Sequence, residues 1–436
     1  QIGYYLGGNI GYNNTGTANT NIITFSNVTF TGTSIANECY LGGNIGNNEN
    51  STSNNNSITF GNVIFTGNSQ IGCNLGGNIG YNNNASDSSN NITFSNVTFT
   101  GNSSIGYCYL GGNVGYNFNT STSNTNTITF GYGTTFTGIA HVNSYMGGNI
   151  GRNSVSIANS NRITFGDNVT FTGNSMRNIC GVGGNIGINI NTSTSNTNII
   201  TFGNNVTFTE NSTRSCYVGG NIGYNTGSTS ANDKITFGDN INIISKALIN
   251  EGIGGIVGNN STSTLSNSIV TYGKYIRMEN INAIIGSIPD TIVIGNICGG
   301  IYLNNNITGN NVIINDNLTV KANSDSSGVL IDGYIGYIGP GTNTITGNSV
   351  KFNNAILQYT TYPATIPLGI IYNSIQYPIG SRIVTSNFNI NVDDITIYVY
   401  IAYVSDLPTC CIVNTVNKNP LNSSYDCDTI INKASG

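Results

Sequence analysis

A three-part motif repeats along most of the sequence with a period of about 35 residues. Residues 5–11 (YLGGNIG) return unchanged at 40–46, and a Gly pair marks every later copy. The pairs begin at Gly7, Gly42, Gly76, Gly111, Gly147, Gly183, Gly219, Gly254 and, in a degraded copy, Gly299. Two aromatic motifs follow in step: Ile-Thr-Phe at Phe25, Phe60, Phe94, Phe130, Phe165, Phe202, Phe237 and Tyr272, and Val-Thr-Phe or close variants at Phe30, Phe65, Phe99, Phe136, Phe171 and Phe208. A regular period of this length is typical of repeat architectures.

The composition of each unit distinguishes β repeats from helical ones. Each unit has three short runs that alternate apolar and polar residues, separated by Gly, Asn, Ser and Thr, which is typical of strands and turns. Helical repeats favour Ala, Leu, Glu and Lys, and kelch-type propellers have a longer period and use a Trp that this chain lacks. We therefore predict an all-β fold, a single-stranded right-handed parallel β-helix of nine to ten coils, with about 35 residues and three strands per coil. The hydrophilic stretches at 119–127 and 191–198 are expected to be surface loops.

Strand parity predicts which residues face the core, because successive side chains of a strand point to opposite faces. In the first strand of a coil, Leu41 and Ile45 are expected to face inward, and Asn44 outward. In the other two strands, the Phe residues are expected to face inward and the neighbouring Thr residues outward. Stacked columns of Phe, Ile and Leu would then form a continuous apolar core.

The chain carries very little charge, with 13 Lys plus Arg and 18 Asp plus Glu among 436 residues. Copies of a residue in a β-solenoid stack about 4.8 Å apart, so a repeated charge would face its own copy, whereas Asn and Thr can hydrogen-bond to theirs. No cation precedes Arg152, which argues against nucleic-acid binding. The longest apolar run, at about 395–404, is too short for a membrane helix of about 20 residues. The chain begins at Gln1 without an initiator Met, which suggests a trimmed or mature form.

The regularity of the repeat divides the chain into three parts. Residues 1–248 are regular coils, 249–354 are degenerate coils, and 355–436 lose the pattern and are predicted to form a C-terminal β cap or assembly segment. No distinct cap sequence precedes the first Gly pair. We therefore hypothesise that an open N-terminal coil docks on the C-terminal segment of another copy, so that the chain self-associates head to tail into a filament.

Most of the cysteines share one position in the repeat, three residues before the Gly pair, where parity directs them inward. They are Cys39, Cys73, Cys108, Cys180 and Cys216, and Ser144 takes the position in the intervening coil. We expect a buried column of free thiols, with disulfides between successive coils as the alternative. Cys410, Cys411 and Cys427 lie outside the repeat and are candidates for one disulfide in an oxidising compartment. One Cys per coil and a single His141 form no tetrahedral cluster, so we predict no metal site and no cofactor.

Neither the glycine motif nor the acidic residues indicate a reaction. Gly-Gly-Asn-Ile-Gly lacks the Lys and the following helix of a phosphate loop, and it lacks the Asp of calcium-binding nonapeptides. Asp167 and Asp239 share one register but lie two coils apart, with Asn204 between them. We predict that the protein is not an enzyme.

Two outward-facing features are candidate sites. Asn-X-Ser/Thr sequons, which accept glycans in secreted proteins, occur at Asn27, Asn50, Asn84, Asn96, Asn119, Asn168, Asn191, Asn205 and Asn260. Two Thr columns are expected on one face, at Thr29, Thr31, Thr98, Thr100, Thr135, Thr137, Thr170, Thr172, Thr207 and Thr209. They resemble the flat Thr-X-Thr arrays of ice-binding β-solenoids, although Thr is also simply a good outward strand residue.

The alternation of Gly-Gly-Asn-Ile with Phe-X-X-Asn-like segments, such as residues 25–28 (FSNV), 60–63 (FGNV) and 94–97 (FSNV), covers residues 1 to about 300. It resembles the GGAI/FxxN repeats of polymorphic outer-membrane proteins and the Asn/Thr-rich adhesin-like β-helix proteins. Asn replaces the usual Ala after the Gly pair, and no autotransporter barrel follows. The resemblance implies an extended, surface-exposed adhesin or coat component.

These observations lead to a functional expectation. We expect a non-enzymatic extracellular structural protein, a β-helix rod that serves as fibre subunit, surface coat or adhesin at a cell or virion surface. A viral or phage fibre or tailspike that binds glycans is the alternative, and an ice-binding solenoid is the third reading. The expected partners are further copies of the chain and a glycan or other cell-surface ligand; no nucleic-acid partner and no membrane span are expected.

Overall fold

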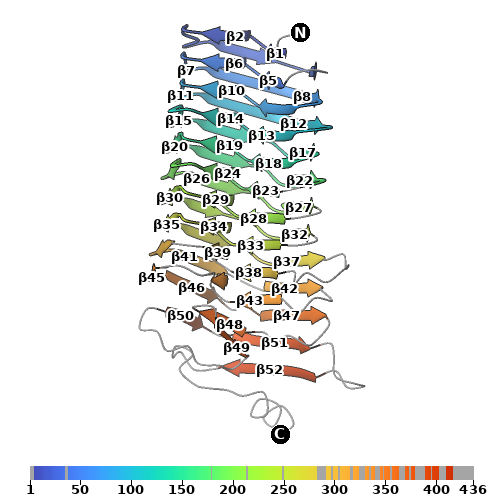
Figure 1. Ribbon diagram of the computed structural model, residues 1–436, viewed down its shortest axis with the longest axis vertical. Helices are drawn as coiled ribbons and strands as arrows, with labels where there is room; N and C mark the ends of the chain where they lie inside the picture. Colours follow the sequence, from blue (N-terminus) through green and yellow to red (C-terminus); the bar gives the residue numbers. More distant parts are fainter. Residues whose placement is uncertain are drawn as a thin grey trace.

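The computed structural model is an all-β parallel β-solenoid with about 35 residues per coil and about seven turns. The coils stack from the N-terminus toward the C-terminus into an elongated body (Figure 1). The structure describes residues 4–34, 38–177, 179–212, 215–247 and 250–281, and beyond these the separate strands and adjoining residues up to 415. Side chains are described up to residue 278, apart from 4 and 246–251, and again at 305–311 and 313.

Two parallel sheets, A and B, are built by the run that contains the Gly pair, because the chain bends at the pair and divides the run into two strands. Sheet A contains β1 (Tyr4–Gly7), β5 (Cys39–Gly42), β9 (Gly72–Gly76), β13 (Tyr107–Gly111), β18 (Asn143–Gly147), β23 (Ile179–Gly183), β28 (Ser215–Gly219), β33 (Asn250–Gly254), β38 (Thr291–Gly295) and β43 (Val329–Asp332). Sheet B contains β2 (Ile10–Asn14), β6 (Ile45–Glu49), β10 (Ile79–Asn83), β14 (Val114–Phe118), β19 (Ile150–Ser154), β24 (Ile186–Ile190), β29 (Ile222–Thr226), β34 (Val257–Ser261), β39 (Cys298–Tyr302) and β44 (Ile335–Ile338).

The hydrophilic stretch of each coil forms a third parallel sheet, C. Its strands are β7 (Thr52–Asn54), β11 (Ser86–Ser88), β15 (Thr122–Asn124), β20 (Ile157–Asn159), β25 (Thr194–Asn196), β30 (Thr229–Ala231), β35 (Thr264–Ser266), β40 (Asn306–Thr308) and β45 (Thr344–Thr346). The prediction that 119–127 and 191–198 are surface loops is therefore wrong. Ser123 and Asn126 are buried, because their polar groups find hydrogen-bond partners inside the coil.

The two aromatic motifs form the largest sheet, D. Ile-Thr-Phe, or the segment that takes its place in the later coils, builds β3 (Ile22–Phe25), β16 (Thr127–Phe130), β21 (Arg162–Phe165), β26 (Ile199–Phe202), β31 (Lys234–Thr236), β36 (Ile269–Tyr272), β41 (Asn311–Ile314), β46 (Asn348–Asn353) and β50 (Phe388–Asp393). The Val-Thr-Phe segment, or the segment that takes its place in the later coils, builds β4 (Val28–Ser34), β17 (Thr135–Ala140), β22 (Thr170–Ser175), β27 (Thr207–Ser212), β32 (Ile241–Ala247), β37 (Ile276–Ile281), β42 (Leu318–Asn323), β47 (Ile356–Tyr362) and β51 (Ile395–Ile401). Both motifs share β8 (Ser57–Ser69) and β12 (Asn91–Ser103). An antiparallel strand β52 (Thr409–Thr415) pairs with β51, and β48 (Gly369–Tyr372) pairs with β49 (Ile375–Pro378). A regular coil thus has five strand segments in four sheets instead of the predicted three strands.

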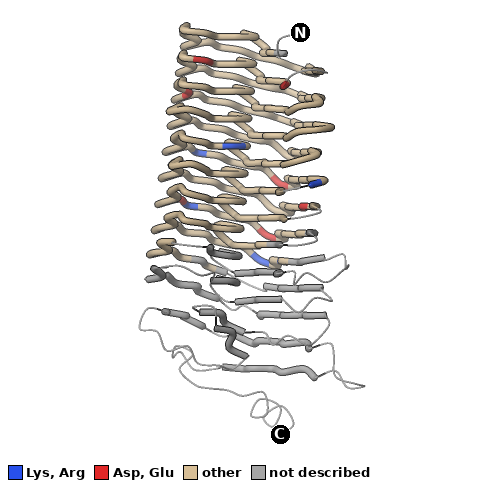
Figure 2. The backbone as a smooth tube through the Cα atoms, viewed as in Figure 1, with Lys and Arg blue, Asp and Glu red and all other residues tan. Residues whose placement is uncertain are grey.

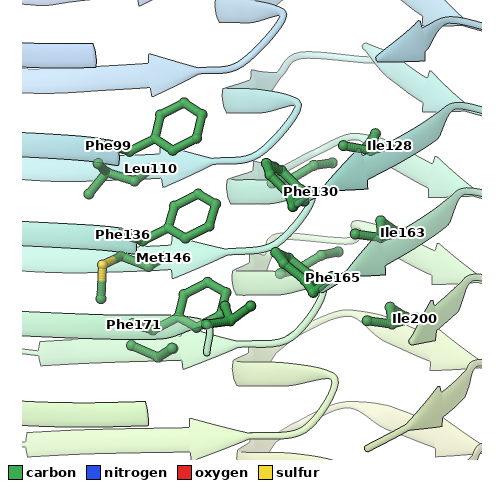
Figure 3. Close-up of a cluster of buried hydrophobic side chains, with 14 of the residues drawn as sticks. Phe99, Leu110, Ile128, Phe130, Phe136, Met146, Ile163, Phe165, Phe171 and Ile200 are labelled. Atoms are coloured by element: carbon green, nitrogen blue, oxygen red, sulfur yellow. The ribbon is translucent and has the colours of Figure 1, made fainter. Parts of the chain in front are cut away.

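Two columns of Phe rings form the apolar half of the interior, as parity predicted. Phe94, Phe130 and Phe165 stack at 4.9 and 4.6 Å between ring centroids, and Phe99 and Phe136 stack at 4.8 Å in the second column. The two columns meet edge to face, which is a favoured aromatic geometry (Figure 3). These rings are at most 2% exposed, so apolar burial provides the main drive for stacking.

The Gly pair is required by close packing at the bend between sheets A and B. A Cβ on Gly43 would lie 2.3 Å from Cζ of Phe60 and 2.2 Å from the carbonyl oxygen of Gly77. A Cβ on Gly42 would lie 1.9 Å from the carbonyl oxygen of Ile45. The chain can therefore turn against the Phe column only where these side chains are absent. Asn44 follows the bend and is buried, so the prediction that it faces outward is wrong.

Candidate functional site

The half of the interior near sheets B and C is polar and is held by ladders of asparagine side chains. In one ladder, each Nδ2 donates to the Oδ1 of the next copy at 2.6–3.0 Å. Its members are Asn13, Asn48, Asn82, Asn117, Asn153, Asn189, Asn225, Asn260 and Asn305. A second ladder includes Asn21, Asn56 and Asn90, joined at 2.9 Å. Asn therefore does bond to its own copies, and both of these ladders lie on the inside of the coil. Exposed bonds between copies also occur, as from Asn62 to Asn27.

Two buried carboxylates, those of Asp87 and Asp233, lie in the polar interior among the asparagine side chains. Asp87 accepts from Asn78 and Asn90 at 2.7 Å and from Asn113 at 2.8 Å, and desolvation raises the pKa of its carboxyl to about 7. Asp233 takes an Asn position in the second ladder and accepts from Nδ2 of Asn198 at 2.9 Å, and desolvation also raises its pKa. Since both side chains are at most 1% exposed, they act as internal hydrogen-bond acceptors and are closed to a dissolved substrate.

A cluster of tyrosine rings covers the bend between sheets A and B on the outer side. Tyr40 contacts Tyr81 with ring centroids 5.0 Å apart, and Tyr109 contacts Tyr116 at 5.3 Å. The tyrosine cluster comprises Tyr5, Tyr12, Tyr40, Tyr81, Tyr107, Tyr109, Tyr116, Tyr145, Tyr217 and Tyr224. Sequence reasoning missed this cluster, although Tyr recurs just before the Gly pair and just after Gly-Gly-Asn-Ile-Gly.

Charged residues are sparse along the described coils (Figure 2). The tyrosine cluster holds one anion and one cation, Glu38 and Arg152. The carboxylate of Glu38 accepts from the hydroxyls of Tyr40 and Tyr107. The guanidinium of Arg152 lies 4.8 Å from the ring centroid of Tyr116, and its Nη1 donates to the hydroxyl of Tyr109 at 2.6 Å. A cation over aromatic faces is stabilised without a carboxylate partner. This arrangement binds the outer faces of sheets A and B to each other.

The thiol column lies in the apolar core. Five thiols of the described coils are fully buried and are not joined in disulfides: Cys39, Cys73, Cys108, Cys180 and Cys216. Sγ of Cys73 contacts the carbonyl oxygen of Asn102 at 3.0 Å, and the hydroxyl of Ser144 donates to the carbonyl of Gly138 at 3.2 Å, so either group fits this position. Burial raises the pKa of Cys39 to about 12. Side chains of Cys410 and Cys411 in β52, and all of Cys427, lie outside the described residues.

The outer face of sheet D carries three columns of threonine. The two predicted columns, at Thr29, Thr31, Thr98, Thr100, Thr135, Thr137, Thr170, Thr172, Thr207 and Thr209, are in register and exposed or half-buried. Ile64 interrupts one of them. A third column, which sequence reasoning did not single out, comes from the middle residue of Ile-Thr-Phe. Its members are Thr24, Thr59, Thr93, Thr129, Thr164, Thr201, Thr236 and Thr271.

Most sequon asparagines lie at turns with left-handed backbone geometry. Positive φ values between 46° and 59° occur at Asn27, Asn50, Asn84, Asn119, Asn168, Asn191 and Asn205. Asn tolerates this region better than most residues, so turn geometry alone accounts for its recurrence there. Asn96 is exposed in β12. Asn260 is fully buried in the first ladder, so the prediction of an accessible acceptor at this position is wrong.

Asp167 and Asp239 both hydrogen-bond to the main chain of the next coil. Their carboxylates accept the main-chain N–H of Asn204 at 2.7 Å and of Lys274 at 2.8 Å, each one coil further on. Within the described ranges, no group of three or more His, Cys, Asp or Glu side chains is arranged to hold a metal ion. The same part of the chain contains no helix that is long and apolar enough to cross a membrane.

Comparison of the chain with protein-family models, with curated proteins and with solved structures finds no match. The class that the fold defines is the parallel β-solenoid with buried asparagine ladders. The resemblance to polymorphic outer-membrane proteins and adhesin-like proteins therefore remains a prediction from the sequence motifs.

Proposed function

We propose that the protein is a non-enzymatic extracellular structural protein, a rod that serves as fibre subunit, surface coat or adhesin. This proposal rests on one observation: most interior side chains of a coil pack against, or hydrogen-bond to, their copies in the next coil. The Phe columns and the Asn ladders repeat in register from coil to coil. Such a stack resists bending and local unfolding, because opening one coil breaks ladder bonds on both of its faces.

The N-terminal end of the stack supports head-to-tail self-association. Strands β1 and β2 are the end strands of sheets A and B, so each has one edge that no described strand pairs. Among the described side chains, the apolar residues that are only partly buried against the main core belong to this first coil: Leu6, Ile10, Ile23, Phe25 and Val28. An exposed parallel edge with an apolar end is a template for a further coil. We propose that the C-terminal segment of another copy, residues 355–436, occupies this end.

Several finer features belong to the same proposal. The rod is right-handed, has nine to ten coils, and ends in a C-terminal cap or assembly segment. It lies outside the cell or on a cell or virion surface, where exposed sequons such as Asn50 and Asn84 carry glycans and a glycan or other surface ligand is bound. The exposure of these two side chains supports their modification.

Electron microscopy of the purified chain over a range of concentrations tests the proposal. Filaments as wide as one solenoid are expected, and Val28→Lys should abolish them because it places a charge in the apolar end of the stack. Thr59→Lys is the matched control, since Thr59 is exposed on the side of the rod, and its filaments should persist. A wild-type chain that stays monomeric, or filaments that survive Val28→Lys, would overturn self-association. Trimeric spikes would favour the fibre or tailspike alternative.

The threonine face supports ice binding as a second candidate. Between Thr93 and Thr209, all three columns present Thr in every coil, without a described charge at these positions. Hydroxyls in a regular array can hydrogen-bond to water molecules at regularly spaced positions. Thermal hysteresis of the purified protein tests this function, and Thr164→Lys should remove it. Freezing behaviour equal to that of a non-binding control protein would exclude it.

A further inference from the structure

Four asparagines at the same position of successive coils are not joined to one another by side-chain hydrogen bonds. Asn113, Asn149, Asn185 and Asn221 directly follow the Gly pair and stack in register, with the backbone N–H of one donating to the carbonyl of the next at 2.9 Å. All four are fully buried. The Oδ1 of each has no hydrogen-bond partner among the described residues, and neither does the Nδ2 of Asn149.

The same column is bonded differently at the N-terminal end. Nδ2 of Asn9 donates to Oδ1 of Asn44 at 3.3 Å, and Nδ2 of Asn44 donates to Oδ1 of Asn78 at 3.2 Å. From Asn78 onward, the Nδ2 groups that have partners donate to side chains of the hydrophilic stretch instead of to the next copy, as Asn78 does to Asp87 and Asn221 does to Ser230. The acceptor oxygens of the coils that follow Asn78 are then left without their donors.

In the coils of Asn113, Asn185 and Asn221 a serine hydroxyl of sheet C receives the Nδ2 group, joined for Asn113 and Asn221 by the carboxylates of Asp87 and Asp233. Asn113 donates to Ser123 at 3.0 Å, and Asn185 donates to Ser195 at 3.2 Å. Ala158 pairs with Ser195 and takes the serine position in the coil of Asn149, so that no serine hydroxyl is present there to receive this amide. Asn149 therefore has both an unpartnered donor and an unpartnered acceptor in a fully buried position.

Buried polar groups without partners are rare in native proteins and usually indicate a bound water or ion. A cation would satisfy the oxygens but not Nδ2 of Asn149, since a donor cannot ligate a cation. Water donates and accepts, so it can satisfy both kinds of group. We propose that Asn113, Asn149, Asn185 and Asn221 hold a row of ordered internal water molecules, with one of them bound between Asn149 and Ala158.

Oxygen-17 water relaxation dispersion on the full chain counts long-lived internal waters and tests the proposal. Ala158→Ser supplies the hydroxyl that neighbouring coils have, so it should remove one long-lived water while leaving the melting temperature unchanged or higher. Ser195→Ala makes the reciprocal change and should add one. Both variants place a residue that the repeat already uses at that position, so both should fold.

A crystal structure of the full chain, with and without rubidium, gives the second readout. Water oxygens within hydrogen-bond distance of the four Oδ1 atoms are expected. An unchanged water count in Ala158→Ser would overturn the proposal. So would direct Nδ2-to-Oδ1 bonds along the column, or an anomalous rubidium peak in place of water.

Discussion

Asn153→Ala tests whether the first asparagine ladder stabilises the rod. Asn153 accepts from Nδ2 of Asn117 at 2.9 Å and donates to Oδ1 of Asn189 at 2.9 Å. Its Nδ2 also lies 3.3 Å from the carbonyl oxygen of Ser156. Alanine removes all of these bonds, and the side chain is fully buried, so solvent cannot replace them.

The expected loss follows from the partners left behind. Two amide–amide bonds contribute about 1 kcal/mol each, and an orphaned buried acceptor on Asn189 costs a further 1–3 kcal/mol, roughly. Asn117 keeps a bond to the carbonyl of Ile157 at 3.3 Å, which limits the penalty on that side. We expect Asn153→Ala to lower the free energy of unfolding by about 3–5 kcal/mol.

Urea denaturation followed by far-UV circular dichroism measures this loss. Asn62→Ala is the control, because its Nδ2 makes a bond of similar length, 3.0 Å, to Asn27 at an exposed site. That variant should cost less than about 1 kcal/mol, since water replaces the lost bond. The double variant Asn153→Ala/Asn189→Ala should cost about 1–2 kcal/mol less than the sum of the single variants. Equal losses for Asn153→Ala and Asn62→Ala, or strict additivity, would refute a coupled ladder.

Three further predictions concern the core. Gly43→Ala should cost more than about 4 kcal/mol in denaturation experiments, because its Cβ would overlap the ring of Phe60; a loss below about 1 kcal/mol would show that the bend can widen. Asp87 has a pKa of about 7 in the fold, against about 3.9 when unfolded, so the folded chain binds the extra proton between these values. The contribution of Asp87 to the free energy of unfolding should therefore fall by about 1.4 kcal/mol per pH unit as the pH rises from about 4 to about 7. Denaturation measured across this pH range should show that Asp87→Ser loses this slope. An unchanged slope would contradict the raised pKa of Asp87. Cys108→Ser should change the free energy of unfolding by less than about 1 kcal/mol, because Ser144 already takes the same position. The buried thiols should react with a thiol reagent only after unfolding. Rapid reaction of the native chain would show that the thiol column is accessible.

The sequence predicted the apolar half of the interior well. Strand parity places Phe60 and Leu41 each on the inner face of its own strand, and the repeat stacks each residue on its copy. Parity failed for Asn44, since the chain bends at the Gly pair and the alternation of faces does not continue through the bend. Composition also misled the prediction for sheet C. Polar stretches are usually exposed, yet Ser123 is buried here because Asn113 and Asn126 donate to its hydroxyl.

The sequence by itself determined the repeat, its period, the strand character of each unit and the columns of like residues. These features depend on local pattern, and a repeated pattern in a solenoid must stack on itself. Only the tertiary structure decided where each coil bends and which columns meet across the interior or across the bend. Asp87 of β11 contacts Asn113 at the bend of the next coil, and Arg152 of β19 contacts Tyr109 of β13 in the neighbouring coil. Such contacts depend on the angle between sheets, which is set by close packing at the Gly pair and is not encoded in the alternation of residues along any one strand.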